Sequence, residues 1–133
     1  MYERWVEPEL LSLLEDEGVG MIAFSPLAQG LLTNKYLHGI PANSRAAKAT
    51  GYLQCDQVTD AIVEKSRKLN EIAQERHQSL AEMALAWLLK DKRVTSVLVG
   101  ASSVEQLLDN LKATENICFS EEECKIIESI LNA

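Results

Sequence analysis

The sequence predicts an α/β protein with two parallel strands and flanking helices, in a single domain over residues 1–133. Two short apolar runs, residues 20–24 and 94–99, have the length and flanking turn residues of buried strands, and the second is rich in β-branched residues. Helical patterns lie between them, so the connection is a parallel crossover. Parallel sheets need several strands with both faces covered. The domain is therefore predicted to be incomplete.

Five helices are predicted from apolar residues that recur at helical spacing. The first follows Pro8 and stops at Gly18. The third, fourth and fifth begin at capping-box patterns, Ser79–Glu82, Ser103–Gln106 and Ser120–Glu123. The predicted apolar faces are, in chain order, Leu10, Leu11, Leu13 and Leu14; Val58, Ile62, Leu69, Ile72 and Ala73; Leu80, Met83, Ala84, Trp87 and Leu88; Val104, Leu107, Leu108 and Leu111; and Cys124, Ile127, Ile130 and Leu131.

Charge and composition exclude several classes of partner. The net charge of −7 repels nucleic-acid backbones and anionic lipids, so neither is expected to bind. No apolar run approaches the ~20 residues that a membrane-spanning helix needs, and the first residues lack the apolar core of a signal peptide. Three scattered cysteines without C-x-x-C spacing predict neither a disulfide framework nor a zinc site. We expect a reduced, cytoplasmic setting.

Both strand ends carry residues suited to binding an anion. Residues 25–30 offer a hydroxyl, a rigid proline turn and an amide-rich bend, and Lys35 follows. Residues 100–103 place a glycine and two serines where a helix begins, and a helix N-terminus attracts phosphate. Such loops meet at the ligand-binding edge of parallel sheets. Taken singly, residues 100–103 are equally consistent with a simple helix cap, and residues 25–30 alone favour a proline-stopped strand followed by a surface turn.

Other chemistry is weakly represented. Gly18 and Gly20 precede a strand instead of following one, so they do not form a dinucleotide-binding loop, and no Walker-type motif is present. His38 and His77 are interpreted as surface residues, and no tyrosine has a neighbour that would activate its phenol. Residues 33–57 form a long irregular segment that is expected to be either functional or disordered.

Several motifs together resemble the aldo-keto reductases, specifically the branch of potassium-channel beta subunits and bacterial glyceraldehyde-3-phosphate reductases. The resemblance covers essentially the whole chain and corresponds to the last third of a family member. It rests on residues 25–33, Lys35-Tyr36, Gly39-Ile40-Pro41, residues 96–102, Glu105-Gln106-Leu107 and Asn110.

The resemblance implies the C-terminal part of a (β/α)8 TIM barrel and NADP(H) as cofactor. One matched stretch lines the pyrophosphate and ribose, two basic residues help to hold the cofactor, and a second stretch surrounds the 2′-phosphate and adenine. Asp109 stands where a glutamate is common and shortens the reach of the carboxylate. The implied cofactor-binding residues are Phe24, Ser25, Pro26, Leu27, Ala28, Gln29, Lys35, Arg45, Gly100, Ser102, Gln106, Asp109 and Asn110.

The family's catalytic Asp, Tyr, Lys and His motifs do not occur in this sequence. The resemblance therefore implies a cofactor-binding segment of an enzyme that reduces aldehydes and ketones to alcohols, with a small carbonyl substrate only in a full-length context. The alternatives are a non-catalytic nucleotide-binding or protein-interaction module, and a ligand-free fragment that self-associates. In each case we expect copies to associate through exposed barrel edges.

Overall fold

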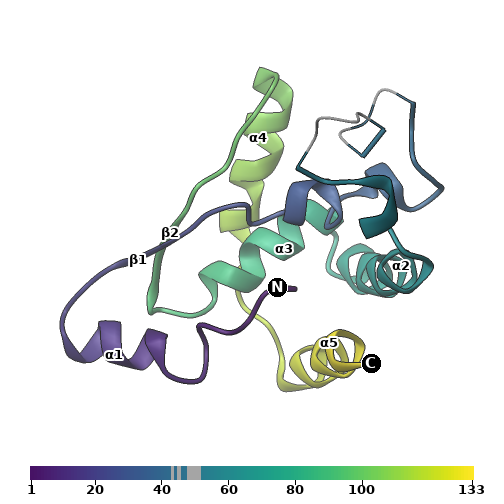
Figure 1. Ribbon diagram of the computed structural model, residues 1–133. Coiled ribbons are helices and arrows are strands. Elements are labelled where there is room, and N and C mark those ends of the chain that lie inside the picture. The colour runs from purple at the N-terminus through teal and green to yellow at the C-terminus, as the bar shows by residue number, and fades with distance from the viewer. Residues whose placement is uncertain (43, 45, 48–51) are drawn as a thin grey trace.

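The computed structural model describes residues 1–42, 44, 46, 47 and 52–133. Its elements follow the predicted order of helices and strands, with four short 3₁₀ turns in addition (Figure 1). In chain order they are α1 (Leu10–Asp16), β1 (Met21–Ala23), η1 (Ala28–Gly30), η2 (Asn34–Tyr36), η3 (Cys55–Gln57), α2 (Asp60–Glu75), α3 (Leu80–Leu89), β2 (Val94–Val97), α4 (Val104–Lys112), η4 (Ala113–Glu115) and α5 (Glu121–Asn132).

The two strands pair in parallel, as the crossover predicts, and within the described residues they form a two-stranded sheet and no closed barrel. Ile22 lies opposite Ser96 and Ala23 opposite Val97, with an irregularity after Met21. At that irregularity the Met21 amide donates to Thr95 Oγ1 over 3.1 Å. A Cβ on Gly20 would lie 2.8 Å from the same oxygen, so a larger residue there would require Thr95 to shift.

The strand pair lies along one side of α3, with α1 and α4 toward its two ends and α2 and α5 beyond α3 (Figure 1). The core is the apolar face of α3 packed against α2 and α5, which confirms the predicted faces except at Leu88, which is half-buried, and at Val58 and Ile62, which pack against a separate cluster. Its fully buried residues include Leu69, Ala73, Leu80, Met83, Ala84 and Ile127. A second cluster of Leu31, Tyr36, Ala46 and Leu53 holds the described part of the long irregular segment to the body.

Helix ends follow local sequence signals with two exceptions. Gly18 ends α1 with φ +67°, as predicted, and the next amide reaches back to Leu14. His77 occupies the equivalent position after α2 with φ +56°, a conformation that glycine adopts at less cost. The boxes at Ser79 and Ser120 are complete. The predicted box at Ser103 is wrong in one half, because the Gln106 side chain bonds Ser102 instead.

Full burial of the two strands was expected and is wrong for one face of the sheet. Ile22, Phe24 and Leu98 are 65%, 78% and 65% exposed, whereas Met21, Ala23 and Val97 are half-buried. The apolar face of α4 is exposed as well, with Val104 at 75%. The physical reason is that no described residue packs against these surfaces. Among the described residues, no helix is both long and apolar enough to cross a membrane.

Candidate functional site

The loops that follow β1 and β2 line one groove of about 730 Å³. The groove brings together nine of the predicted cofactor-binding residues, namely Phe24, Ser25, Pro26, Leu27, Gln29, Lys35, Gly100, Ser102 and Gln106. Its other lining residues are Gly30, Thr33, Leu98, Val99 and Ala101. The parallel pairing explains this meeting, because it places the carboxyl ends of both strands at the same edge.

The first loop has an unusual backbone. Ser25, Ala28 and Gln29 have φ values of 50°, 47° and 61°, in the left-handed region that costs a non-glycine residue about 1–2 kcal/mol. Two reverse turns hold this path: the Ala28 amide donates to Ser25 O and the Gly30 amide to Leu27 O, each over 2.9 Å. Strain of this kind concentrates at ligand-binding sites. No glycine marks positions 25, 28 or 29, so the sequence carried no signal for it.

Thr33 holds the backbone of Lys35 beside the groove. Its hydroxyl donates to the Gly30 carbonyl over 2.7 Å and accepts the Lys35 amide over 3.2 Å, which caps η2. Tyr36, next in the chain, is buried in the second cluster. Lys35 is therefore anchored on both sides while its own side chain remains exposed. Thr33 was missed as a site residue, although a threonine two positions before a groove lysine is a recognisable cap signal.

The second loop closes on itself at the start of α4. Ser103 Oγ accepts the Gln106 amide over 3.2 Å, the usual N-cap bond. The Gln106 carboxamide oxygen accepts both donors of Ser102, the backbone amide over 2.8 Å and the hydroxyl over 3.0 Å. Two donors of one residue thus converge on a single oxygen beside a helix N-terminus. This arrangement is suited to receiving an anionic oxygen.

The groove is electropositive in a chain that is acidic overall. Among its described lining residues Lys35 is the one with a titratable side chain, and no carboxylate lines it. The acidic side chains that give the chain its net charge of −7 therefore lie outside the described lining of the groove. The local balance of one cation and helix-end amides therefore favours an anion despite the charge of the whole chain.

Three further predicted residues do not line the groove, and a fourth lies outside the described residues. Ala28 lines a second cavity of about 590 Å³. Asp109 is ion-paired with Lys112 over 2.7 Å, and this contact raises the pKa of the lysine. Asn110 is buried, and its Nδ2 has no hydrogen-bond partner among the described residues. Arg45 lies outside the described residues.

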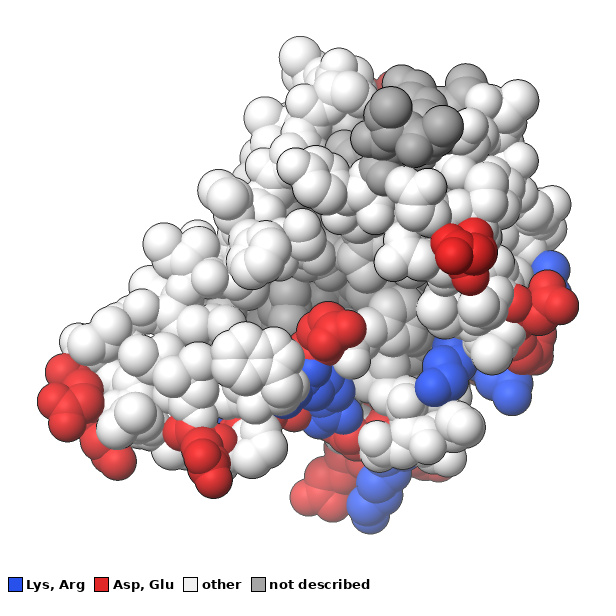
Figure 2. Space-filling view, in the orientation of Figure 1, with Lys and Arg blue, Asp and Glu red and all other residues white. Residues whose placement is uncertain are grey.

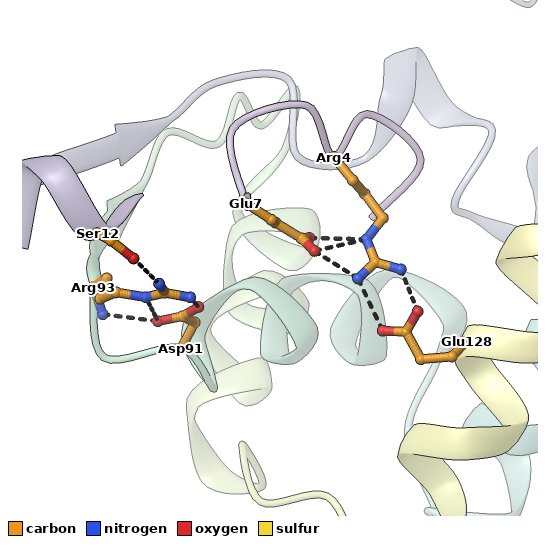
Figure 3. A network of polar contacts seen from close by, with 6 residues as sticks. All are labelled: Arg4, Glu7, Ser12, Asp91, Arg93 and Glu128. Atoms are coloured by element: carbon orange, nitrogen blue, oxygen red, sulfur yellow. Dashed lines mark hydrogen bonds and ion pairs between the residues drawn. The ribbon is translucent and has the colours of Figure 1, made fainter. Parts of the chain in front are cut away.

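The second cavity is bordered by polar contacts that hold the N-terminal segment in place (Figure 3). Arg4 donates to Glu7 and to Glu128 on α5, in each case with a bond of 2.9 Å. Arg93, after α3, bonds Asp91 over 2.7 Å and Ser12 of α1 over 3.1 Å. These side chains are already paired with one another, so we interpret the network as structural.

Tyr2, which lines this cavity, has a hydroxyl that is held by a hydrogen bond. Ser66 donates to the Leu31 carbonyl over 2.9 Å, so the Tyr2 hydroxyl must donate to Ser66 Oγ over 2.8 Å. Burial raises the pKa of the Tyr2 phenol. The Tyr2 hydroxyl is therefore committed to the serine and harder to ionise than a free phenol.

The described fold, two parallel strands with flanking helices and a groove at their carboxyl ends, is a partial α/β structure, and comparison with known proteins identifies its family. The model of the aldo/keto reductase family matches residues 1–132, and the chain belongs to that family. It is 54% identical over 133 residues to the L-glyceraldehyde 3-phosphate reductase of Escherichia coli O157:H7. That match covers 96% of this chain and 38% of the relative.

A second group of relatives is named as beta subunits of voltage-gated potassium channels. The chain is 40% identical over 114 residues to a probable voltage-gated potassium channel subunit beta of Oryza sativa subsp. japonica, covering 84% of this chain and 35% of the relative. The chain therefore spans well under half the length of the curated relatives that it matches.

Proposed function

We propose that this chain is the NADP(H)-binding segment of an aldo/keto reductase that reduces aldehydes or ketones to alcohols, and that alone it binds the cofactor without catalysing the reaction. The single observation that carries the proposal is the groove in which both strand-end loops converge on one cation and one helix N-terminus. The groove's donor set matches what a phosphate-rich ligand requires.

The residues present fit the cofactor's phosphates. The Ser102 amide and hydroxyl both donate to the Gln106 oxygen, within 3.0 Å. A phosphate oxygen could accept the same two donors in place of the Gln106 oxygen, so Ser102 and Gln106 would be residues that hold the cofactor at this end of the groove. Lys35 supplies the charge from the other loop. Gly100 has nothing within 4 Å of the position where a Cβ would lie, so the backbone there is open to close approach.

When bound, NADPH supplies the hydride for carbonyl reduction. The reaction also needs an acid placed beside the carbonyl. Lys35, the titratable side chain among the described lining residues, is assigned here to the phosphates, and Tyr2 in the second cavity is held with a raised pKa. We therefore propose that the catalytic acid and the pocket for a small carbonyl substrate belong to the part of a reductase that this chain does not span.

A fluorescence titration of the pure chain with NADPH and NADH tests the proposal. We expect saturable binding of NADPH that is about tenfold tighter than that of NADH, because the 2′-phosphate adds a charged contact. Lys35→Ala should weaken NADPH binding about tenfold and Ser102→Ala about fivefold. Lys68→Ala is the matched control, since this exposed lysine lies on α2 and not in the groove.

Two results would contradict the proposal. Absence of saturable binding at millimolar NADPH would leave only the fragment without a ligand. A carbonyl-dependent oxidation of NADPH by the pure chain, above the rate without protein, would refute its catalytic incompleteness.

A further inference from the structure

Ser66 occupies a position on α2 that the packing of the core does not explain. It lies in the interior of the helix and is 3% exposed, on the side that carries the buried Leu69 and Ala73. An apolar side chain would suit this position better, because a buried hydroxyl costs free energy unless it is hydrogen-bonded. The single proton of Ser66 is donated to the Leu31 carbonyl over 2.9 Å. The hydroxyl therefore connects α2 to the chain that follows the first loop of the groove.

Arg67, the next residue of α2, makes a second connection to the same stretch of chain. Its Nε and Nη2 atoms both donate to the Leu37 carbonyl, over 3.0 and 2.8 Å. Residues 31–37 are thus held by α2 at both ends, by Ser66 at the first residue and by Arg67 at the last. We call these two side chains the α2 clamp.

The segment that the α2 clamp holds carries the cation of the groove. Lys35 lies within it, and its side chain is exposed. The Leu31 amide donates to the Ala28 carbonyl over 3.1 Å, so Leu31 is bonded to the first loop at its amide and to α2 at its carbonyl. Four other positions of the segment reinforce the same path by burial or capping, namely Leu32, Thr33, Tyr36 and Leu37.

A backbone that is fixed in advance raises the affinity of an exposed lysine for an anion. The side chain of Lys35 loses rotamer freedom when it binds, and any ordering of the backbone at the same step subtracts further from the binding free energy. The α2 clamp removes that second cost. It also supports the left-handed backbone of the first loop, since such strain persists only where the surroundings determine it.

We propose that Ser66 and Arg67 are positioning residues of the groove, which hold residues 31–37 so that Lys35 is placed to bind the phosphates of NADPH. Neither is among the described residues that line the groove. This role rests on the proposed function, because it concerns how the same site binds its cofactor. Tyr2 also bonds Ser66, over 2.8 Å, but that bond does not reach the segment and is not part of the α2 clamp.

Ser66→Ala tests the α2 clamp against a control of similar structural cost. It removes the bond to Leu31 and leaves the Tyr2 hydroxyl unpaired. Tyr2→Phe removes only the bond that the tyrosine donates and keeps the bond from Ser66 to Leu31. We expect both substitutions to lower the thermal midpoint by about 5 °C. Only Ser66→Ala should weaken NADPH binding, about fivefold in a fluorescence titration at a temperature where each variant is folded.

Arg67→Met tests the other end of the segment and should also weaken NADPH binding about fivefold. Its control is Lys68→Met, which removes the same charge from the next residue of α2 and keeps both bonds to Leu37. Figure 2 shows basic and acidic side chains intermixed on the side of the molecule that carries α2 and α5. Since exposed charges there are screened, Lys68→Met should change the affinity less than twofold, on the order expected for a remote surface charge.

A double-mutant cycle shows whether the α2 clamp acts through Lys35. In a chain that already carries Lys35→Ala, Ser66→Ala should change the affinity for NADPH by less than about twofold, because the side chain that it positions is gone. The fall in the thermal midpoint from Ser66→Ala should be the same with and without Lys35. A purely structural role of Ser66 would instead lower the affinity equally in both backgrounds.

The outcomes separate this role from the proposed function. Absence of saturable NADPH binding by the unsubstituted chain refutes the proposed function and the clamp's part in it. Normal binding by that chain, with an affinity that Ser66→Ala and Arg67→Met leave unchanged, overturns the α2 clamp alone. A loss of affinity no greater than that from Tyr2→Phe, or one that persists in full without Lys35, overturns it as well. If Ser66→Ala does not fold, the comparison of Arg67→Met with Lys68→Met decides.

Discussion

At the scale of single residues, Arg4 connects the N-terminal segment to the last helix. Its guanidinium bonds both Glu7 and Glu128, and this contact holds the pKa of the Glu128 carboxyl below its ordinary value. Folding therefore stabilises the charged carboxylate. The resulting contribution to stability is present above the unfolded pKa, near ~4.3, and is lost as the pH falls through the lowered folded pKa.

We predict that Arg4→Met lowers the free energy of unfolding by about 1 kcal/mol at neutral pH. The difference from the unsubstituted chain should shrink as the pH falls through the lowered folded pKa of Glu128, because the carboxyl is then protonated in both proteins. Urea unfolding across this pH range measures it. Lys112→Met is the control, since its pair with Asp109 is exposed to solvent and should contribute less to stability than the Arg4 contacts. A difference independent of pH would contradict the assignment.

At the scale of elements, α3 and α4 share the same type of N-cap but differ in what surrounds them. Ser79 accepts the Glu82 amide over 3.2 Å, and α3 then runs through the centre of the core. Ser103 accepts the Gln106 amide over the same distance, but the apolar face of α4 lies in solvent. The stability of α3 is thus coupled to the whole fold, and that of α4 is largely its own.

We therefore predict that Ser79→Ala lowers the global free energy of unfolding by about 1 kcal/mol. Ser103→Ala should shift it by less than about 0.5 kcal/mol and instead speed amide exchange within α4. Urea unfolding measures the first effect and hydrogen exchange the second. Equal losses of global stability from the two substitutions would show that α4 unfolds only with the core.

The elements themselves could be predicted because their signals are local. Capping serines, helical spacing and turn residues fixed five helices and two strands to within a few residues. The groove could be predicted because parallel pairing brings strand ends together. Two features could not. The positive φ angles at Ser25, Ala28 and Gln29 could not be predicted, because none of these positions is a glycine. His77 likewise occupies a helix-end position where glycine is usual.

The predicted burial of the two strands and of the apolar face of α4 was the larger error. Its cause is that no described residue packs against these surfaces. Apolar spacing predicted that Val104, Leu107 and the two strands face a core, but spacing cannot say whether this chain supplies that core. Ile22 and Leu98 follow the apolar pattern of buried strand residues, but no described residue packs against them. The sequence therefore predicted the surfaces correctly and their environment wrongly.

At the scale of the whole molecule, the chain has a packed core and two exposed apolar surfaces. One is the side of the sheet with Ile22, Phe24 and Leu98, and the other is the apolar face of α4. Hydrophobic contact between copies favours association, while a charge of −7 on each copy opposes it. Repulsion between exposed charges is screened by salt, whereas the burial of apolar surface is not weakened by it. The balance between the two forces should therefore depend on ionic strength.

We predict weak self-association of the isolated chain that increases with protein concentration and with salt. Sedimentation velocity between micromolar and millimolar protein, at low and at high sodium chloride, measures it. The double substitution Leu107→Glu and Leu111→Glu should suppress association, because both side chains lie on the exposed face of α4. Ile126→Glu, on α5, adds the same kind of charge elsewhere and should reduce association less. A compact monomer at every concentration and salt would show that these apolar surfaces do not drive copies together.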